Sequence, residues 1–113
     1  MRNETEVRAY LRQQLDKDFE LHEEVCVRHS LFKRRRLRLD LLAIPMDPRL
    51  SDIALAFETK PDREWDIPLW SEALKQASDY VLATVEPDLK AHAGKRVMAV
   101  FVYPSPLEGL ADA

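Results

Sequence analysis

The amino-acid sequence predicts a single α/β domain with the element order α-β-β-β-α-β, in which helices flank a mixed sheet. The 113 residues are enough for one hydrophobic core and too few for two. Two segments repeat apolar residues at helical spacing, and four others are short apolar runs typical of strands. Gly94 and Gly109 are the only glycines, which excludes a glycine-rich nucleotide-binding loop. We expect the domain to span residues 1–104 and residues 105–113 to form a flexible tail.

The first helix is expected from Asn3 to about Asp16. Asn3 is a good helix-capping residue, and Glu6 stands three positions later, as in a capping box. The apolar stripe of this helix consists of Val7, Leu11 and Leu15. Glu4 projects from the inward-facing side of the first turn, where a carboxylate either only interacts with the helix dipole or also reaches a site on the sheet.

Three strands are expected next, at Leu21–Leu31, Leu37–Ile44 and Ile53–Lys60. The third is apolar on both faces over most of its length, which indicates a central strand covered on both sides. Pro61 ends this strand because proline cannot donate a ladder hydrogen bond. In the loop that follows, Trp65 either contacts a substrate or anchors the loop to the core, and we favour the anchor.

The second helix is expected from Pro68 or Leu69 to Val85. Gln76 and Tyr80 are four residues apart and therefore project from one side of this helix. They are either a surface glutamine over a half-buried tyrosine or a polar pair directed at the sheet. The buried stripe of the helix is expected to contain Leu74, Ala77 and Val81. The last strand is expected at Arg96–Tyr103, a β-rich apolar run.

A candidate metal site lies where the second and third strands are expected to pair. Side-chain alternation puts Asp40 on one face of its strand and puts Glu58 and Lys60 together on one face of the next strand. If the strands pair antiparallel about a turn near Arg49, one register opposes Asp40 to Glu58, with Cβ atoms roughly 4.5–5.5 Å apart. Two neighbouring carboxylates repel each other, and a divalent cation is the strongest compensating charge.

Magnesium suits this predicted pair because it prefers oxygen ligands and commonly binds one or two carboxylates together with a substrate phosphate. Lys60 beside the ion would orient the attacking water or help to deprotonate it, which predicts hydrolysis of a phosphodiester. In the alternative interpretation, Asp40, Glu58 and Lys60 form a structural ion-pair network in a simple α/β domain.

The formal net charge of −3 disfavours a purely electrostatic nucleic-acid binder. The basic residues are nevertheless concentrated in one segment, at Arg28, Lys33, Arg34, Arg35, Arg36 and Arg38. Such a cluster is either a local footprint for phosphate groups or a solvated hairpin tip.

The single cysteine, Cys26, cannot form an internal disulfide and lies in an apolar run, which favours a reducing compartment. The first residues lack an apolar signal region, and no apolar run reaches membrane-spanning length. We therefore expect a cytoplasmic protein without a membrane partner. His22, His29 and His92 show no ligand spacing, so a zinc site is not expected.

Four motifs stand in order along the chain: Glu4 on the first helix, Asp40 on the second strand, Glu58-Thr59-Lys60 on the third strand, and Gln76 with Tyr80 on the next helix. Together they resemble the PD-(D/E)XK nuclease superfamily, although Leu39 stands where the name of the superfamily has a proline. The segment Gln76-Ala77-Ser78-Asp79-Tyr80 is similar to the Q-x-x-x-Y element of RecB-like nucleases and of type I restriction nuclease domains. Glu4, followed by Val7, Arg8 and Leu11, resembles the first helix of the latter domains. The resemblance extends over nearly the whole chain up to Tyr103 and implies a restriction endonuclease-like core.

The resemblance also implies a role for each motif residue. Asp40, Glu58 and the backbone carbonyl of Thr59 would bind Mg²⁺, with Mn²⁺ as a substitute. Lys60 would position or activate the attacking water, and Glu4 would bind a second metal ion or hold a metal-coordinated water. Gln76 would steady Lys60 or the scissile backbone, and Tyr80 would support Gln76 or a phosphate. The expected nucleic-acid contacts are Arg34, Arg35, Arg36, Arg38, Gln76 and Tyr80.

We therefore expect a magnesium-dependent nuclease that hydrolyses phosphodiester bonds, with DNA favoured over RNA as its substrate. The alternative is a non-catalytic nucleic-acid-binding or protein-binding module on the same fold. The chain has no room for a separate sequence-reading domain. Specificity would then come from the structure of the substrate, from a homodimer or from a partner protein in a larger assembly.

Overall fold

The computed structural model describes residues 2–29, 31–32, 35–60 and 67–104. Its elements, in chain order, are α1 (Glu4–Leu15), β1 (Phe19–Arg28), β2 (Arg36–Pro45), the 3-10 turn η1 (Pro48–Leu50), β3 (Ile53–Thr59), α2 (Ile67–Tyr80), β4 (Thr84–Val85), the 3-10 segment η2 (Pro87–His92) and β5 (Arg96–Tyr103). The α/β class with a mixed sheet is confirmed. The predicted element order is wrong in one respect, because a short strand, β4, follows α2.

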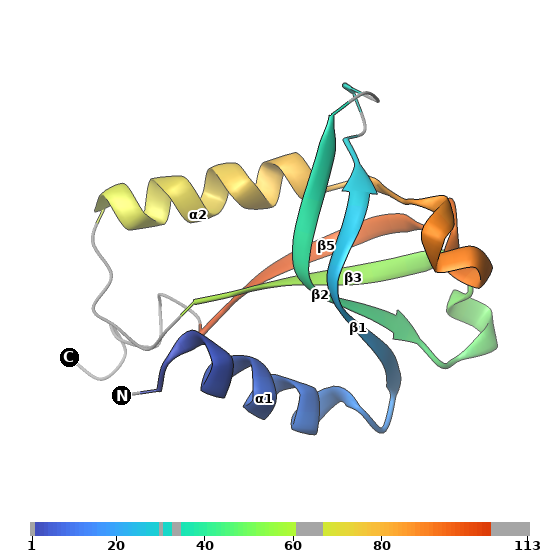
Figure 1. Cartoon of the computed structure of the whole chain (residues 1–113), viewed down its shortest axis with the longest axis horizontal. Coiled ribbons are helices and arrows are strands. Elements are labelled where there is room, and N and C mark those ends of the chain that lie inside the picture. The colour runs from blue at the N-terminus through green and yellow to red at the C-terminus, as the bar shows by residue number, and fades with distance from the viewer. Residues whose placement is uncertain (1, 30, 33–34, 61–66, 105–113) are drawn as a thin grey trace.

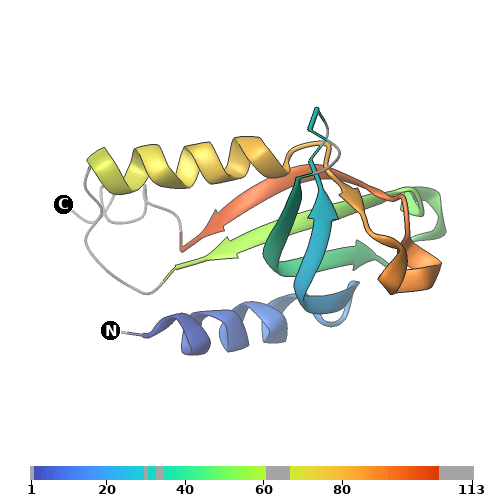
Figure 2. The same cartoon turned by 45° about the horizontal axis from the view of Figure 1, so that its top comes forward.

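The strands pair in the order β1-β2-β3-β5-β4, and β4 pairs again with β1, so the sheet closes on itself. β2 runs antiparallel to β1 and β3, whereas β3 and β5 are parallel. A parallel pair requires a long crossover, and the connection that contains α2 supplies it. β3 lies between β2 and β5, and its residues alternate between buried and partly buried, so one face is less fully covered than predicted. The two helices lie on opposite sides of β3 and β5 (Figures 1 and 2).

The start of α1 follows the capping chemistry of its sequence. The side chain of Asn3 accepts a hydrogen bond from the backbone N–H of Glu6 at 2.8 Å, and the Glu6 carboxylate accepts one from the N–H of Asn3 at 3.3 Å. This reciprocal pair is the predicted capping box. Val7 and Leu11 are buried, so the helix packs with its predicted apolar stripe inward.

The main core gathers buried side chains from all five strands and from the end of α2. Its members are Val25, Val27, Leu39, Leu42, Ile44, Ala54, Ala56, Tyr80, Ala83, Val85 and Val97. Leu41 and Ala43 are also fully buried, although they alternate with Leu42 along the strand. β2 is therefore covered on both faces next to Asp40, which keeps this part of the strand rigid.

The second helix ends at Tyr80 and not at Val85, so its predicted end is wrong. Leu82 adopts a left-handed backbone with φ of 64°, which no α-helix can continue through. The N–H of Leu82 donates instead to Val97 on β5 at 2.8 Å. Val81 is consequently 40% exposed and does not belong to the buried stripe; Tyr80, at 8% exposure, takes the inward position.

The other boundaries differ from the predicted ones by a few residues. β1 begins earlier than expected, at Phe19, and ends at Arg28, while β3 ends at Thr59. Cys26 is partly exposed and does not lie in the deep core. Two predictions, for Trp65 and for the tail at 105–113, concern residues that lie outside the described ranges.

Candidate functional site

The register of β2 and β3 brings the two predicted carboxylates together. Leu41 pairs with Phe57 in the last pair of this ladder, and the same register continued by one residue brings Asp40 level with Glu58. The Oδ2 atom of Asp40 accepts hydrogen bonds from the backbone N–H of Thr59 at 2.8 Å and from its hydroxyl at 3.2 Å. These bonds hold the Asp40 carboxylate of β2 against Thr59, the last residue of β3.

The Glu58 carboxylate lies in an unusual environment. The residue is only 5% exposed, and its Oε1 atom is buried without a hydrogen-bond partner among the described residues. Burial, followed by the negative charge of Asp40, raises the pKa of Glu58 to about 7, while the charge of Lys60 acts in the opposite direction. Hydrogen bonds from the Asp40 backbone and the Tyr80 hydroxyl to this carboxyl group also lower its pKa, but to a smaller extent. Because Oε1 lies close to a second carboxylate and has no partner among the described residues, its environment is one that a cation would complete.

Lys60 and Gln76 meet at the open end of this pair. The Lys60 ammonium donates a hydrogen bond to Oε1 of Gln76 at 3.2 Å, which links the end of β3 to α2. Tyr80, one helical turn further, donates from its hydroxyl to the carbonyl oxygen of Arg38 at 2.9 Å. Burial, then the charges of Glu58 and Asp40, raises the pKa of Tyr80, so this hydroxyl is a hydrogen-bond donor at neutral pH.

Glu4 reaches the site only through an arginine that the sequence interpretation did not assign to it. Glu4 is half exposed and forms an ion pair at 3.4 Å with Arg8, one turn further along α1. Arg8 also lies 3.8 Å from Oδ1 of Asp40, and its Nε atom is buried without a partner among the described residues. The signal that could have identified Arg8 is its i+4 spacing from Glu4.

The predicted nucleic-acid contacts in the basic segment are engaged with carboxylates. The nearest pairs are Arg35 with Asp79 at 3.2 Å, Arg36 with Glu86 at 2.8 Å and Arg38 with Glu24 at 2.8 Å. Arg34 lies outside the described residues. Acidic partners reduce the local positive potential, so this surface offers less attraction to phosphate than the sequence indicated.

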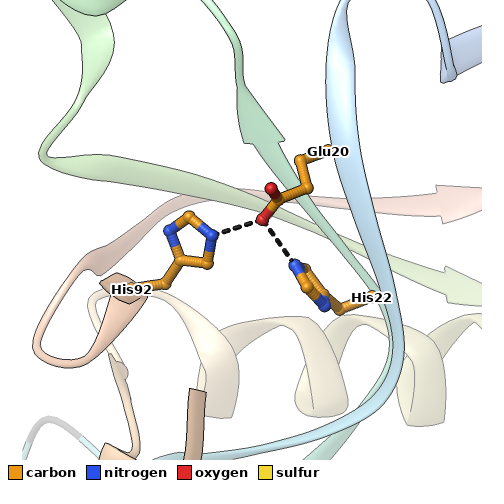
Figure 3. A group of neighbouring side chains, drawn as sticks. All are labelled: Glu20, His22 and His92. Atoms are coloured by element: carbon orange, nitrogen blue, oxygen red, sulfur yellow. Dashed lines mark hydrogen bonds and ion pairs between the residues drawn. The ribbon is translucent and has the colours of Figure 1, made fainter. Parts of the chain in front are cut away.

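A second group of chemically able side chains lies elsewhere on the sheet. Glu20 and His22 of β1 converge with His92, the last residue of η2, and their ligand-type atoms lie within 4.8 Å of one another (Figure 3). Sequence spacing did not reveal this group because His92 is distant along the chain from Glu20 and His22. Alternation on β1, which puts Glu20 and His22 on one face, was the available signal.

Comparison of the chain with protein-family models, curated proteins and solved structures finds no match. Among the described residues, no helix has both the length and the apolar character needed to cross a membrane. The functional argument therefore rests on the geometry and chemistry of the residues themselves.

Proposed function

We propose that the protein is a metal-dependent nuclease of the PD-(D/E)XK type, which hydrolyses phosphodiester bonds in nucleic acid, with DNA as the favoured substrate. The observation that supports this function best is the carboxylate pair itself. Glu58 is buried opposite Asp40 and has an Oε1 atom without a partner among the described residues. A carboxylate in this position is costly for a protein that uses it only for structure.

The available donor atoms fit a hard cation such as Mg²⁺. Thr59 donates both of its hydrogen bonds to Oδ2 of Asp40 and none to Oδ1. Oε1 of Glu58 has no hydrogen-bond partner among the described residues. The carbonyl of Thr59 points to the same side of β3 as its N–H, because both groups of one residue face the same neighbouring strand. These three oxygens would hold the ion. When bound, the ion supplies positive charge that neutralises the phosphate and acidifies the attacking water.

The hydrogen bond between Lys60 and Gln76 supports a role for Lys60 in handling the water or the phosphate. Gln76 accepts one of its N–H donors and so restricts the ammonium group to the edge of the carboxylate pair. A charged ammonium there can donate to the negative charge that develops on the phosphate in the transition state. Gln76 acts through Lys60 and is a positioning residue in this proposal.

Arg8 adds a second positive charge on the other side of Asp40. Its 3.8 Å separation from Oδ1 is longer than a hydrogen bond, so the guanidinium can turn toward a phosphate oxygen when Asp40 binds a cation. Glu4 pairs with Arg8 and would orient it. The sequence predicted that Glu4 binds a second metal ion or a metal-coordinated water. Its ion pair with Arg8 supports an orienting role instead.

The rival proposal of a non-catalytic phosphate-binding module has less support. The described arginines of the basic segment have acidic partners. The carboxylates of Asp40 and Glu58 would repel a phosphate in the absence of a cation. A purely structural network remains the stronger rival, because Arg8 and Thr59 both contact Asp40.

Cleavage assays separate these alternatives. Single-stranded, duplex, flapped and four-way-junction DNA, together with RNA, would be incubated with Mg²⁺, Mn²⁺ or EDTA. We expect metal-dependent cutting by the wild type and a loss of about 100-fold or more in Lys60→Ala, as for removal of a catalytic proton-handling group. Lys75→Ala, which changes an exposed lysine on α2, should retain full activity.

The structural alternative makes the opposite prediction. It would be correct if the wild type cut none of these substrates with either metal, and if Asp40→Asn and Glu58→Gln changed only the free energy of unfolding. Equal cutting by Lys60→Ala and the wild type would disprove the role of Lys60. The same assays, with light scattering, would show whether the active species is a homodimer, in which two sites could address two strands.

A further inference from the structure

Three side chains at the other end of the sheet form a compact group that the proposed nuclease chemistry does not use. Nε2 of His22 lies 2.7 Å from Oε2 of Glu20, and Nε2 of His92 makes a second short contact with the same oxygen. Figure 3 shows both rings directed at the carboxylate from different sides. Glu20 pairs with Ile44 on β2. Ile44 is four residues from Asp40 along this strand, so the group lies about 13 Å from Asp40 at a rise of ~3.3 Å per residue.

The fold positions these donors through two separate constraints. Glu20 and His22 are two residues apart on β1, so they share a face, and β2 fixes this part of β1 through the pairs with Ile44 and Leu42. His92 ends η2, and the following turn is closed by hydrogen bonds from Gly94 to Val85 and from Lys95 to His92. Glu20 and His92 are 72 residues apart in sequence, yet β1 and η2 direct three ligand-type side chains to one point.

The geometry points to a second metal site, at which Glu20, His22 and His92 bind a divalent transition metal ion, with Zn²⁺ as the best fit. Two imidazole nitrogens and one carboxylate oxygen form a ligand set that zinc favours and that Mg²⁺, which prefers oxygen, does not. The Asp40–Glu58 site offers only oxygens. The two sites therefore select different metals.

The spacing of the donors is close to that of a metal centre. Ligands about 2.1 Å from a tetrahedral zinc ion lie about 3.4 Å apart. Oε2 of Glu20 and Nε2 of His22, now 2.7 Å apart, would need to separate by less than about 1 Å. The Glu20 side chain is half exposed, so its rotation can provide this movement without disturbing the core.

The open side of the site faces a pocket of about 240 Å³. Glu20 and His92 line it together with Asp47, Ser51 and Lys95. Three protein ligands and an accessible fourth position are typical of zinc sites that bind water or a small ligand, whereas purely structural sites have four protein ligands.

Zinc binding can be measured directly on the tag-free chain, because a polyhistidine tag would itself bind the ion. Competition with a chromogenic chelator, in buffer containing excess Mg²⁺, should show one Zn²⁺ bound per chain. We expect His22→Gln and His92→Gln to weaken binding by at least about 100-fold, more than the loss of an outer-shell partner. Circular dichroism would confirm that both variants remain folded.

Matched controls make the outcome specific. Glu23→Gln changes an exposed carboxylate on the same strand and should leave zinc affinity unchanged. Asp40→Asn should also leave it unchanged, so failure of the nuclease proposal and failure of this one are distinguishable. The inference is overturned if the wild type does not compete with the chelator, or if both histidine variants bind zinc as tightly as the wild type, since the ion would then lie elsewhere.

A spectroscopic readout tests the ligand set independently of affinity. Co²⁺ substituted for Zn²⁺ should show the intense visible absorption of a four-coordinate or five-coordinate ion in the wild type. His92→Gln should lose this absorption, and Asp40→Asn should retain it. A spectrum typical of a fully hydrated octahedral ion in the wild type would contradict binding by these three residues.

Discussion

Replacing Glu58 by glutamine should change how the stability of the protein depends on pH. The pKa of Glu58 is raised from 4.5 to about 7, mainly by burial and then by the charge of Asp40. Below pH 4.5 the carboxyl is neutral in the folded and unfolded states. As the pH rises toward 7, the unfolded state loses the proton first, so unfolding becomes progressively more favourable.

The magnitude follows from the size of the shift. One pKa unit corresponds to about 1.36 kcal/mol, so the wild type should lose about 3 kcal/mol of unfolding free energy between pH 4.5 and pH 8 through this one group. Glutamine has nearly the same shape and cannot ionise. Glu58→Gln should therefore be about as stable as the wild type at low pH and more stable by up to about 3 kcal/mol at pH 8.

Urea denaturation at both pH values measures this difference, because titrating groups that do not interact with Glu58 affect the wild type and the variant equally. With a slope of roughly 1–3 kcal/mol per molar urea, the variant midpoint at pH 8 should lie about 1–3 M above that of the wild type. Glu72→Gln, at an exposed position on α2, should change stability by less than about 0.5 kcal/mol at either pH. The reasoning is refuted if the difference between Glu58→Gln and the wild type is the same at both pH values.

Magnesium connects this measurement with the proposed function. A cation at the carboxylate pair stabilises the charged form of Glu58, so saturating Mg²⁺ at pH 8 should restore stability to the wild type. Mg²⁺ at 100 times its dissociation constant would contribute about 2.7 kcal/mol. Glu58→Gln should gain much less. Equal stabilisation of both proteins would place the ion elsewhere.

Two further predictions concern stability. Asn3→Ala removes the capping box of α1 and should lower the unfolding free energy by about 1 kcal/mol, measurable as a lower melting temperature; an unchanged value would mean that the cap contributes nothing. Arg36→Met removes two hydrogen bonds to the buried Glu86 carboxylate and leaves it the longer ion pair with Arg28 at 3.6 Å, so it should cost about 1.5–3 kcal/mol in urea denaturation. Arg38→Met breaks an exposed pair and should cost less than about 1 kcal/mol. Equal costs for the two arginines would contradict the difference in burial between their partners.

Local chemistry explains which parts of the fold could be predicted. The Asn3–Glu6 capping box follows from residues close together in sequence. The antiparallel pairing of β2 with β3, whose register continues toward Asp40 and Glu58, follows from simple alternation. The short strand β4 could not be predicted, because two residues carry no periodicity. Leu82 ends α2 in a conformation that its side chain does not favour, so no sequence signal marked this boundary.

Long-range contacts explain why the candidate site was predicted only in part. Asp40, Glu58 and Lys60 were identified because strand alternation places them, and Gln76 because helical spacing relates it to Tyr80. The acidic partners of the basic segment, such as Glu86, come from distant parts of the chain, and charge clustering alone cannot show them. The same is true of His92, which reaches β1 across most of the sequence.

The binding of Mn²⁺ to the wild type and to Asp40→Asn, measured by electron paramagnetic resonance and calorimetry at pH 8, tests the central claim most directly. Binding at this pair requires the Asp40 carboxylate, while the structural alternative assigns that carboxylate only to Thr59 and Arg8. Our account predicts Mn²⁺ binding that Asp40→Asn weakens by at least about 100-fold, and Mg²⁺ competes for the same ion site. Equal Mn²⁺ affinity in the two proteins, or no binding by the wild type, would contradict it.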